Sequence, residues 1–112
     1  MIENLQTVAK GELKATLGKL KAKDYRLITI IGAIVDEKLE ITYALESKED
    51  MQFAAVRTIY GFDEEVASVQ DIYLNAMLYE WEISDLFDVN VENAPKGALL
   101  EPEKRGPFRR DV

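Results

Sequence analysis

Residues 79–89, YEWEISDLFDV, contain the densest set of side chains able to do chemistry in this chain. Four carboxylates, Glu80, Glu82, Asp85 and Asp88, stand there among large apolar residues. Carboxylates act as general acids or bases, as ligands of hard cations, and as acceptors for arginine and lysine. The stretch therefore raises three possibilities: catalysis, a metal site, or recognition of a basic partner.

The spacing of the apolar residues predicts a helix over residues 76–87, with an apolar side that packs on the core. Residues three and four apart are neighbours on a helix, so Glu82 and Asp85 lie together at its edge. Any of these carboxylates that is buried needs a partner, because an unpaired buried charge is strongly unfavourable.

Recognition fits this helix better than catalysis or metal binding. A catalytic pair needs carboxylates across a cleft, whereas these lie side by side. The acids also lack the alternating loop positions of an EF-hand. We therefore predict no catalytic residue and no metal ligand, and assign Glu80, Glu82 and Asp85 to partner binding. A simple capping and solvating role stays open, and a carboxylate enzyme with a divalent metal is a further hypothesis.

Composition narrows the chemistry further. The 112 residues include no cysteine and no histidine. This excludes thiolate zinc sites, iron–sulfur clusters and histidine-assisted nucleophiles built from this chain. We expect no cofactor. No apolar run approaches the roughly 20 residues that span a bilayer, and no signal peptide is recognisable, so we expect a cytoplasmic protein.

The net charge of −7 is unevenly distributed. Residues 1–24 hold five lysines and three acids, residues 25–100 five basic and fifteen acidic residues, and residues 101–112 four basic and three acidic residues. An acidic body between basic ends argues against nucleic acid as a ligand. It suits a basic protein partner, although net charge also serves solubility alone.

The pattern along the chain predicts a single α+β domain over residues 1–100, followed by an extended basic tail over residues 101–112. In the domain, a small antiparallel sheet of about three strands packs with an N-terminal and a C-terminal helix. The predicted elements are a helix at 11–21, strands at 25–35, 38–45 and 53–60, and a helix at 76–87. The strand at 25–35 is apolar on both faces, which predicts a central strand covered on both sides.

The tail contains prolines and a group of arginines. We assign Arg105, Arg109 and Arg110 to partner binding, because arginine makes bidentate contacts with carboxylates. In the alternative, the tail folds back onto the carboxylates of its own chain.

The segment at 68–89 resembles the signature of the 30-kDa-type subunit of respiratory complex I and its hydrogenase relatives. The matching residues are Ser68, Val69, Asp71, Ile72, Ala76, Glu80, Glu82, Asp85 and Phe87. The closing GPFRRDV resembles the end of the same family at Pro107, Arg109 and Asp111. Two departures are Trp81, where the family has arginine, and Asp88, where it has the glycine that ends the helix.

This resemblance implies a compact member, as in Ech-type membrane-bound energy-converting hydrogenases. Such a chain is a cofactor-free structural or assembly subunit of an energy-converting hydrogenase or a complex I-like NADH dehydrogenase. It docks on the catalytic large subunit, beside an iron–sulfur subunit, and lies peripherally on the inner face of the membrane without inserting into it. The alternative function is a stand-alone acidic adaptor for some other basic protein.

Overall fold

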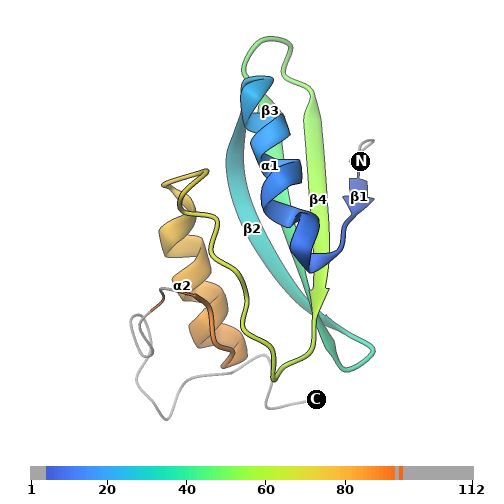
Figure 1. The fold of residues 1–112 in the computed structure, drawn as a ribbon, viewed down its shortest axis with the longest axis vertical. Coiled ribbons are helices and arrows are strands. Elements are labelled where there is room, and N and C mark those ends of the chain that lie inside the picture. The colour runs from blue at the N-terminus through green and yellow to red at the C-terminus, as the bar shows by residue number, and fades with distance from the viewer. Residues whose placement is uncertain (1–4, 93, 95–112) are drawn as a thin grey trace.

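The computed structural model describes residues 5–92 and residue 94 of the chain. They form an α+β fold in which a four-stranded sheet packs with two helices (Figure 1). The elements are β1 (Leu5–Thr7), the 3-10 helix η1 (Lys10–Glu12), α1 (Leu13–Ala22), β2 (Tyr25–Val35), β3 (Lys38–Ser47), β4 (Phe53–Tyr60) and α2 (Ala76–Phe87). The predicted α+β class is confirmed, and the predicted tail lies outside the described residues.

The sheet has the strand order β1-β4-β3-β2. β2 and β3 are antiparallel, as are β3 and β4, which confirms the three predicted strands. The short β1 adds a fourth strand parallel to β4, with Leu5 opposite Ala55, so the sheet is mixed rather than purely antiparallel. A three-residue strand carries too little periodicity to be separated from a lead-in segment by sequence alone.

Asp36 and Glu37 connect β2 to β3 as a two-residue hairpin turn. Both residues have positive φ, 51° and 62°. Two consecutive left-handed residues are the geometry of a type I′ turn, whose twist matches the flanking strands. The hairpin therefore forms with a residue pair that this turn type does not usually favour.

The predicted central position of β2 is wrong. β2 is the edge strand beside β3, and only one of its faces points to the core. Ile30 is buried on that face, whereas Ile31 and Val35 are 52 % and 41 % exposed on the other. Apolar residues on both faces indicated burial on both sides, but within the described residues the second face is left open.

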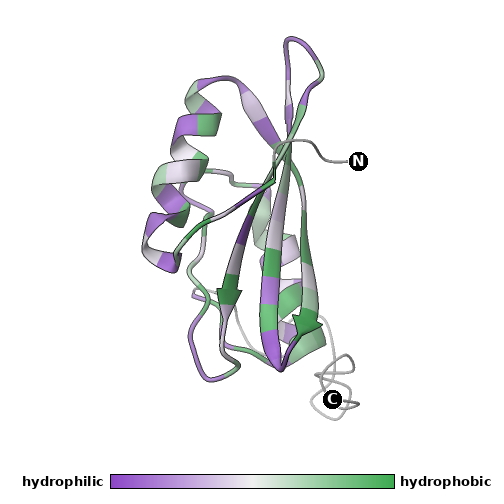
Figure 2. Cartoon of the chain, turned by 90° about the vertical axis from the view of Figure 1, so that its right-hand side faces the viewer, coloured by the Kyte–Doolittle hydropathy of each residue, from purple (hydrophilic) through white to green (hydrophobic). Residues whose placement is uncertain are grey.

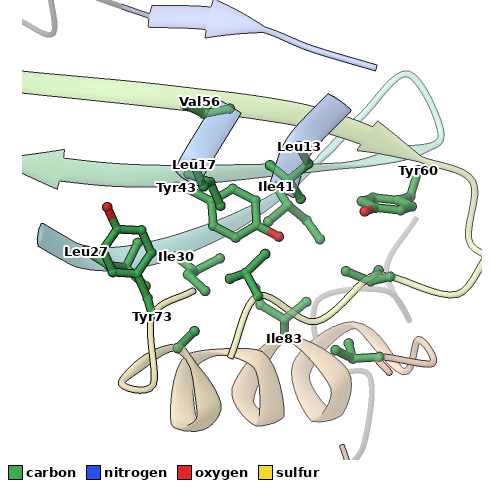
Figure 3. Close-up of a cluster of buried hydrophobic side chains, with 14 of the residues drawn as sticks. Leu13, Leu17, Leu27, Ile30, Ile41, Tyr43, Val56, Tyr60, Tyr73 and Ile83 are labelled. Carbon is green, nitrogen blue, oxygen red and sulfur yellow. The ribbon is translucent and has the colours of Figure 1, made fainter. Parts of the chain in front are cut away.

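One hydrophobic core joins the sheet to both helices (Figure 3). Alternate residues of β3 point into it, and Leu13 and Leu17 of α1 are completely buried in the same cluster. From α2, Ile83 and Phe87 enter the same cluster. Both helices therefore serve one face of the sheet, and the described residues place neither helix over the opposite face.

Candidate functional site

α2 packs on β2 at a position where only glycine fits. A Cβ atom on Gly32 would lie 2.6 Å from Phe87 Cε2 and 2.8 Å from Ile83 Cδ1, well inside van der Waals contact. The sequence signal was a lone glycine in a strand otherwise rich in β-branched residues, which marks a close approach of another element. Gly32 thus sets how closely the carboxylate helix approaches the sheet.

Three polar side chains, two just before α2 and one in its first turn, hydrogen-bond to backbone carbonyls of β2. These carbonyls lie on the edge strand, where no further strand of the described residues pairs with them. The three bonds run from Tyr73 Oη to Tyr25 O at 2.7 Å, from Asn75 Nδ2 to Leu27 O at 3.0 Å, and from Tyr79 Oη to Ile28 O at 2.9 Å. They hold the first turn of α2 beside the strand.

Glu80 has an internal role. The residue is 2 % exposed, and its carboxylate accepts three hydrogen bonds: from Ser68 Oγ at 2.8 Å, Val69 N at 2.7 Å and Gln70 Nε2 at 2.9 Å. Ser68 Oγ also accepts a hydrogen bond from Gln70 N, at 3.2 Å. Glu80 therefore stabilises the loop before α2, which departs from the expectation that it serves mainly assembly. The available sequence signal was that all four residues lie within one signature segment.

The other two assigned carboxylates lie in contrasting environments. Asp85 is completely buried and has an interaction partner. Glu82 is exposed and forms no ion pair with any described residue. Of the three carboxylates, Glu82 alone remains accessible to another molecule. The three assigned arginines lie outside the described residues.

The helix ends at Asp88, whose backbone is left-handed with φ 50° and ψ 53°. Its N–H donates to the carbonyl of Ser84, and Ser84 Oγ donates to the carbonyl of Val89 at 3.0 Å. The left-handed end expected from the family pattern is thus present, with an aspartate in place of glycine.

The side of α2 that faces away from the sheet is also apolar. Leu74, just before the helix, is 79 % exposed, and Leu78, one turn later, is 58 % exposed. Together with Met77 they line an open depression of about 330 Å³. The half-buried Trp81 lies one turn after Met77, and its indole N–H is buried without an acceptor in the described part of the chain.

Lysines of the N-terminal segment form ion pairs with acidic residues that lie before and after α2 in the sequence. Lys10 pairs with Glu64, and Lys14 lies 3.6 Å from Asp71 and 4.0 Å from Glu92. All five side chains are substantially exposed, so each pair contributes only about 0–1 kcal/mol. The fold therefore brings some of the basic residues of the N-terminal segment next to acidic residues that are far away in the sequence.

The face of the sheet opposite the core carries exposed apolar side chains. Figure 2 shows that hydrophobic (green) residues occur along the strands of the sheet, and the register assigns them to its two faces. Alternation along the strands and the strand register place on this face Leu5 of β1, Ile31 and Val35 of β2, and Phe53 and Ile59 of β4, which are 38–53 % exposed. We call these five residues the outer sheet surface.

Both arginines on this face are paired with glutamates of β3. Arg26 donates to Glu46, with 2.5 Å between Nη2 and Oε1. Arg57 lies 3.5 Å from Glu40 and also donates to the hydroxyl of Thr7 at 3.0 Å. The outer sheet surface is therefore apolar with locally neutralised charges.

Burial shapes the ionisation of the core tyrosines. The pKa of Tyr43 is raised well above its ordinary value, first by burial and then by repulsion from Tyr60 and Glu80. Burial also raises the pKa of Tyr60, and it raises that of Tyr73 to about 12. These hydroxyls stay protonated in the folded protein over the physiological range.

The described part of the chain contains no group of three or more carboxylates that could hold a metal ion. None of its helices combines the length and the apolar character needed to cross a membrane.

The family model described as respiratory-chain NADH dehydrogenase, 30 Kd subunit, matches residues 6–112. The chain therefore belongs to this family, which confirms the resemblance drawn from residues 68–89. No curated protein matches the chain. A similar solved structure is a chain in the membrane-bound sulfane sulfur reductase (MBS), an archaeal respiratory membrane complex. It has a TM-score of 0.84 and 24 % identity, and the match covers 96 % of this chain and 70 % of that chain, which shows a shared fold.

Proposed function

We propose that this chain is a non-catalytic structural subunit of a membrane-bound energy-converting hydrogenase or a complex I-like NADH dehydrogenase. In this proposal it docks on the catalytic large subunit, beside an iron–sulfur subunit, at the inner face of the membrane. Family membership supports the proposal. The observation that carries it is the outer sheet surface.

An open apolar sheet face of this kind is typical of a protein interaction site. β2 is apolar on both faces, the pattern of a strand covered on both sides, and a docked subunit would supply the second cover. Because Arg26 and Arg57 are already paired on this face, the complementary surface of the large subunit should be apolar and nearly uncharged at its centre.

The charged residues that were assigned to partner binding have different roles in this proposal. Glu82 remains a direct contact, because it is exposed. Glu80 acts indirectly by holding the loop before α2. The tail residues Arg105, Arg109 and Arg110 remain proposed contacts with acids of the large subunit.

Co-expression with the large subunit tests the sheet contact. Ile31→Glu should reduce co-purification at least tenfold, because it places an unpaired charge in an apolar interface. Its isolated melting temperature should stay within a few degrees of the parent, since the side chain is exposed. Ala15→Glu, on the exposed side of α1, is the matched control and should assemble normally. Normal assembly of Ile31→Glu would refute docking through this face.

Deletion of residues 103–112 tests the tail separately. If the tail binds the large subunit, the truncated protein should melt near the parent temperature and fail to co-purify. A truncated protein that assembles normally contradicts the proposed role, and one that unfolds supports the fold-back alternative.

A further inference from the structure

We infer that the outward face of α2 is a second docking surface, which receives a segment of another subunit carrying aliphatic side chains and, about one helical turn further on, an arginine or lysine. The surface consists of Leu74, Met77, Leu78, Trp81 and Glu82. The inference rests on the proposed function and deepens it, because it assigns a second neighbour in the complex and the chemistry of that contact.

The apolar part of this surface is accessible and hollowed. Leu74 is the most exposed large apolar side chain among the described residues, and Leu78 is 58 % exposed. The depression of about 330 Å³ that they line with Met77 is large enough to receive aliphatic side chains. Burying these side chains against a partner would remove their apolar surface from water, which is favourable.

The charge on this surface defines the partner further. Leu78 and Glu82 are four residues apart in α2 and are therefore neighbours on one face of the helix. Leu74, just before the helix, lines the same depression as Leu78. Glu82 is exposed and forms no ion pair with any residue in the range 5–92. An arginine or lysine on the partner, one turn beyond its aliphatic side chains, would neutralise Glu82 as the leucines become covered.

A second copy of this chain does not fit the same surface. A symmetric contact between two α2 helices, centred on Leu78, would set Glu82 of each copy against Leu74 of the other. Each carboxylate would then be partly desolvated against a leucine without a cation, which is unfavourable. The spacing therefore favours a different chain.

The two docking surfaces also require different partners. On the outer sheet surface both arginines are paired within the chain, so an uncharged apolar partner is sufficient. On α2 an unneutralised carboxylate borders the leucines, so a basic group is needed. This difference indicates that the second segment comes from a separate part of the complex.

Photo-cross-linking in the purified complex tests the inference. A benzophenone amino acid replaces Leu78, with matched replacements at Ile31 on the sheet and at Lys19 on the exposed side of α1. We expect the Leu78 probe to cross-link to a co-purifying subunit, at a peptide in which lysine or arginine lies three to five residues from aliphatic residues. The Ile31 probe should react with a different peptide, and the Lys19 probe with none.

Each other outcome overturns the inference. These outcomes are a cross-link from Leu78 to this chain's own residues 95–112, a cross-link to a second copy, or no cross-link although the Ile31 probe reacts. In the last case the proposed function stands and the α2 surface is free. If the chain does not co-purify with any subunit, the proposed function itself fails.

Reversing the charge of Glu82 tests the inference independently of cross-linking. Glu82→Arg should lower retention of the cross-linked subunit at least tenfold, and reversal of the identified basic residue to glutamate should restore it. Glu82→Gln should lower retention less, and the parent complex should lose the same subunit as salt concentration rises. Thermal unfolding of the isolated variants should match the parent, because Glu82 is exposed. Unchanged retention of Glu82→Arg contradicts the assigned chemistry.

Discussion

The carboxylate of Glu80 accepts a hydrogen bond from the backbone N–H of Val69 at 2.7 Å, and the same carboxylate holds the hydroxyl of Ser68. Replacement of Glu80 by alanine should lower the free energy of unfolding by about 3–5 kcal/mol, because it leaves buried donors without an acceptor. Glu82→Ala should change it by no more than about 0.5 kcal/mol. Urea unfolding of both variants measures the difference, and similar losses for the two would contradict the internal role of Glu80.

The two glycines Gly32 and Gly18 should respond in opposite ways to alanine. Gly32→Ala should destabilise the protein by about 1–3 kcal/mol, because its Cβ would collide with Phe87 and Ile83. Gly18→Ala, in α1 with nothing within 4 Å of the new Cβ, should stabilise it by about 1 kcal/mol. Thermal unfolding distinguishes these signs, and a neutral Gly32→Ala would mean that α2 shifts freely on the sheet.

Alkaline pH should unfold this protein through its buried tyrosines. The folded pKa values of Tyr43 and Tyr73 lie above the unfolded value of about 10. Their contribution to stability is therefore complete below pH 10 and is lost as pH rises above it, by about 1.4 kcal/mol per pH unit for each group. Urea unfolding at pH 8, 10 and 11 should show a shallower decline for Tyr43→Phe than for the parent. An identical decline in both would exclude Tyr43 as a cause.

The aromatic residues of α2 should contribute unequally to stability. Phe87 is 3 % exposed, and Phe87→Ala should cost about 3–5 kcal/mol. Trp81→Phe should be close to neutral in the isolated chain, because it removes a buried N–H that has no acceptor in the described structure. Equilibrium unfolding measures both, and a loss above about 2 kcal/mol for Trp81→Phe would indicate that the indole N–H is bonded in solution.

The pattern of neighbouring residues in the sequence was sufficient to predict most of the helices and strands. The predicted bounds of β2, β4 and α2 agree with the structure, because hydrophobic periodicity and β-branched content are properties of contiguous residues. The position of β2 at the edge of the sheet was not accessible in this way. The apolar residues on both faces of β2 indicate that both faces are buried. They do not indicate whether a helix of the same chain or another molecule buries the second face.

The site was less predictable because it depends on contacts between distant residues. The sequence analysis assigned Glu80 and Glu82 alike to partner binding. The structure separates them, because the loop at residues 68–70 folds over Glu80 and leaves Glu82 in solvent. The exposed Leu74 and Leu78 were assigned no function, since an apolar residue in or beside a helix usually indicates core.

The hydrogen bonds from Tyr73, Asn75 and Tyr79 to β2 also protect part of the edge of the sheet. The carbonyls they occupy are acceptors that an incoming strand from another molecule would need in order to extend the sheet. An open strand edge beside an apolar outer sheet surface is otherwise at risk of strand-to-strand aggregation. The three side chains block that route along residues 25–28 of β2, so a second molecule cannot extend the sheet there.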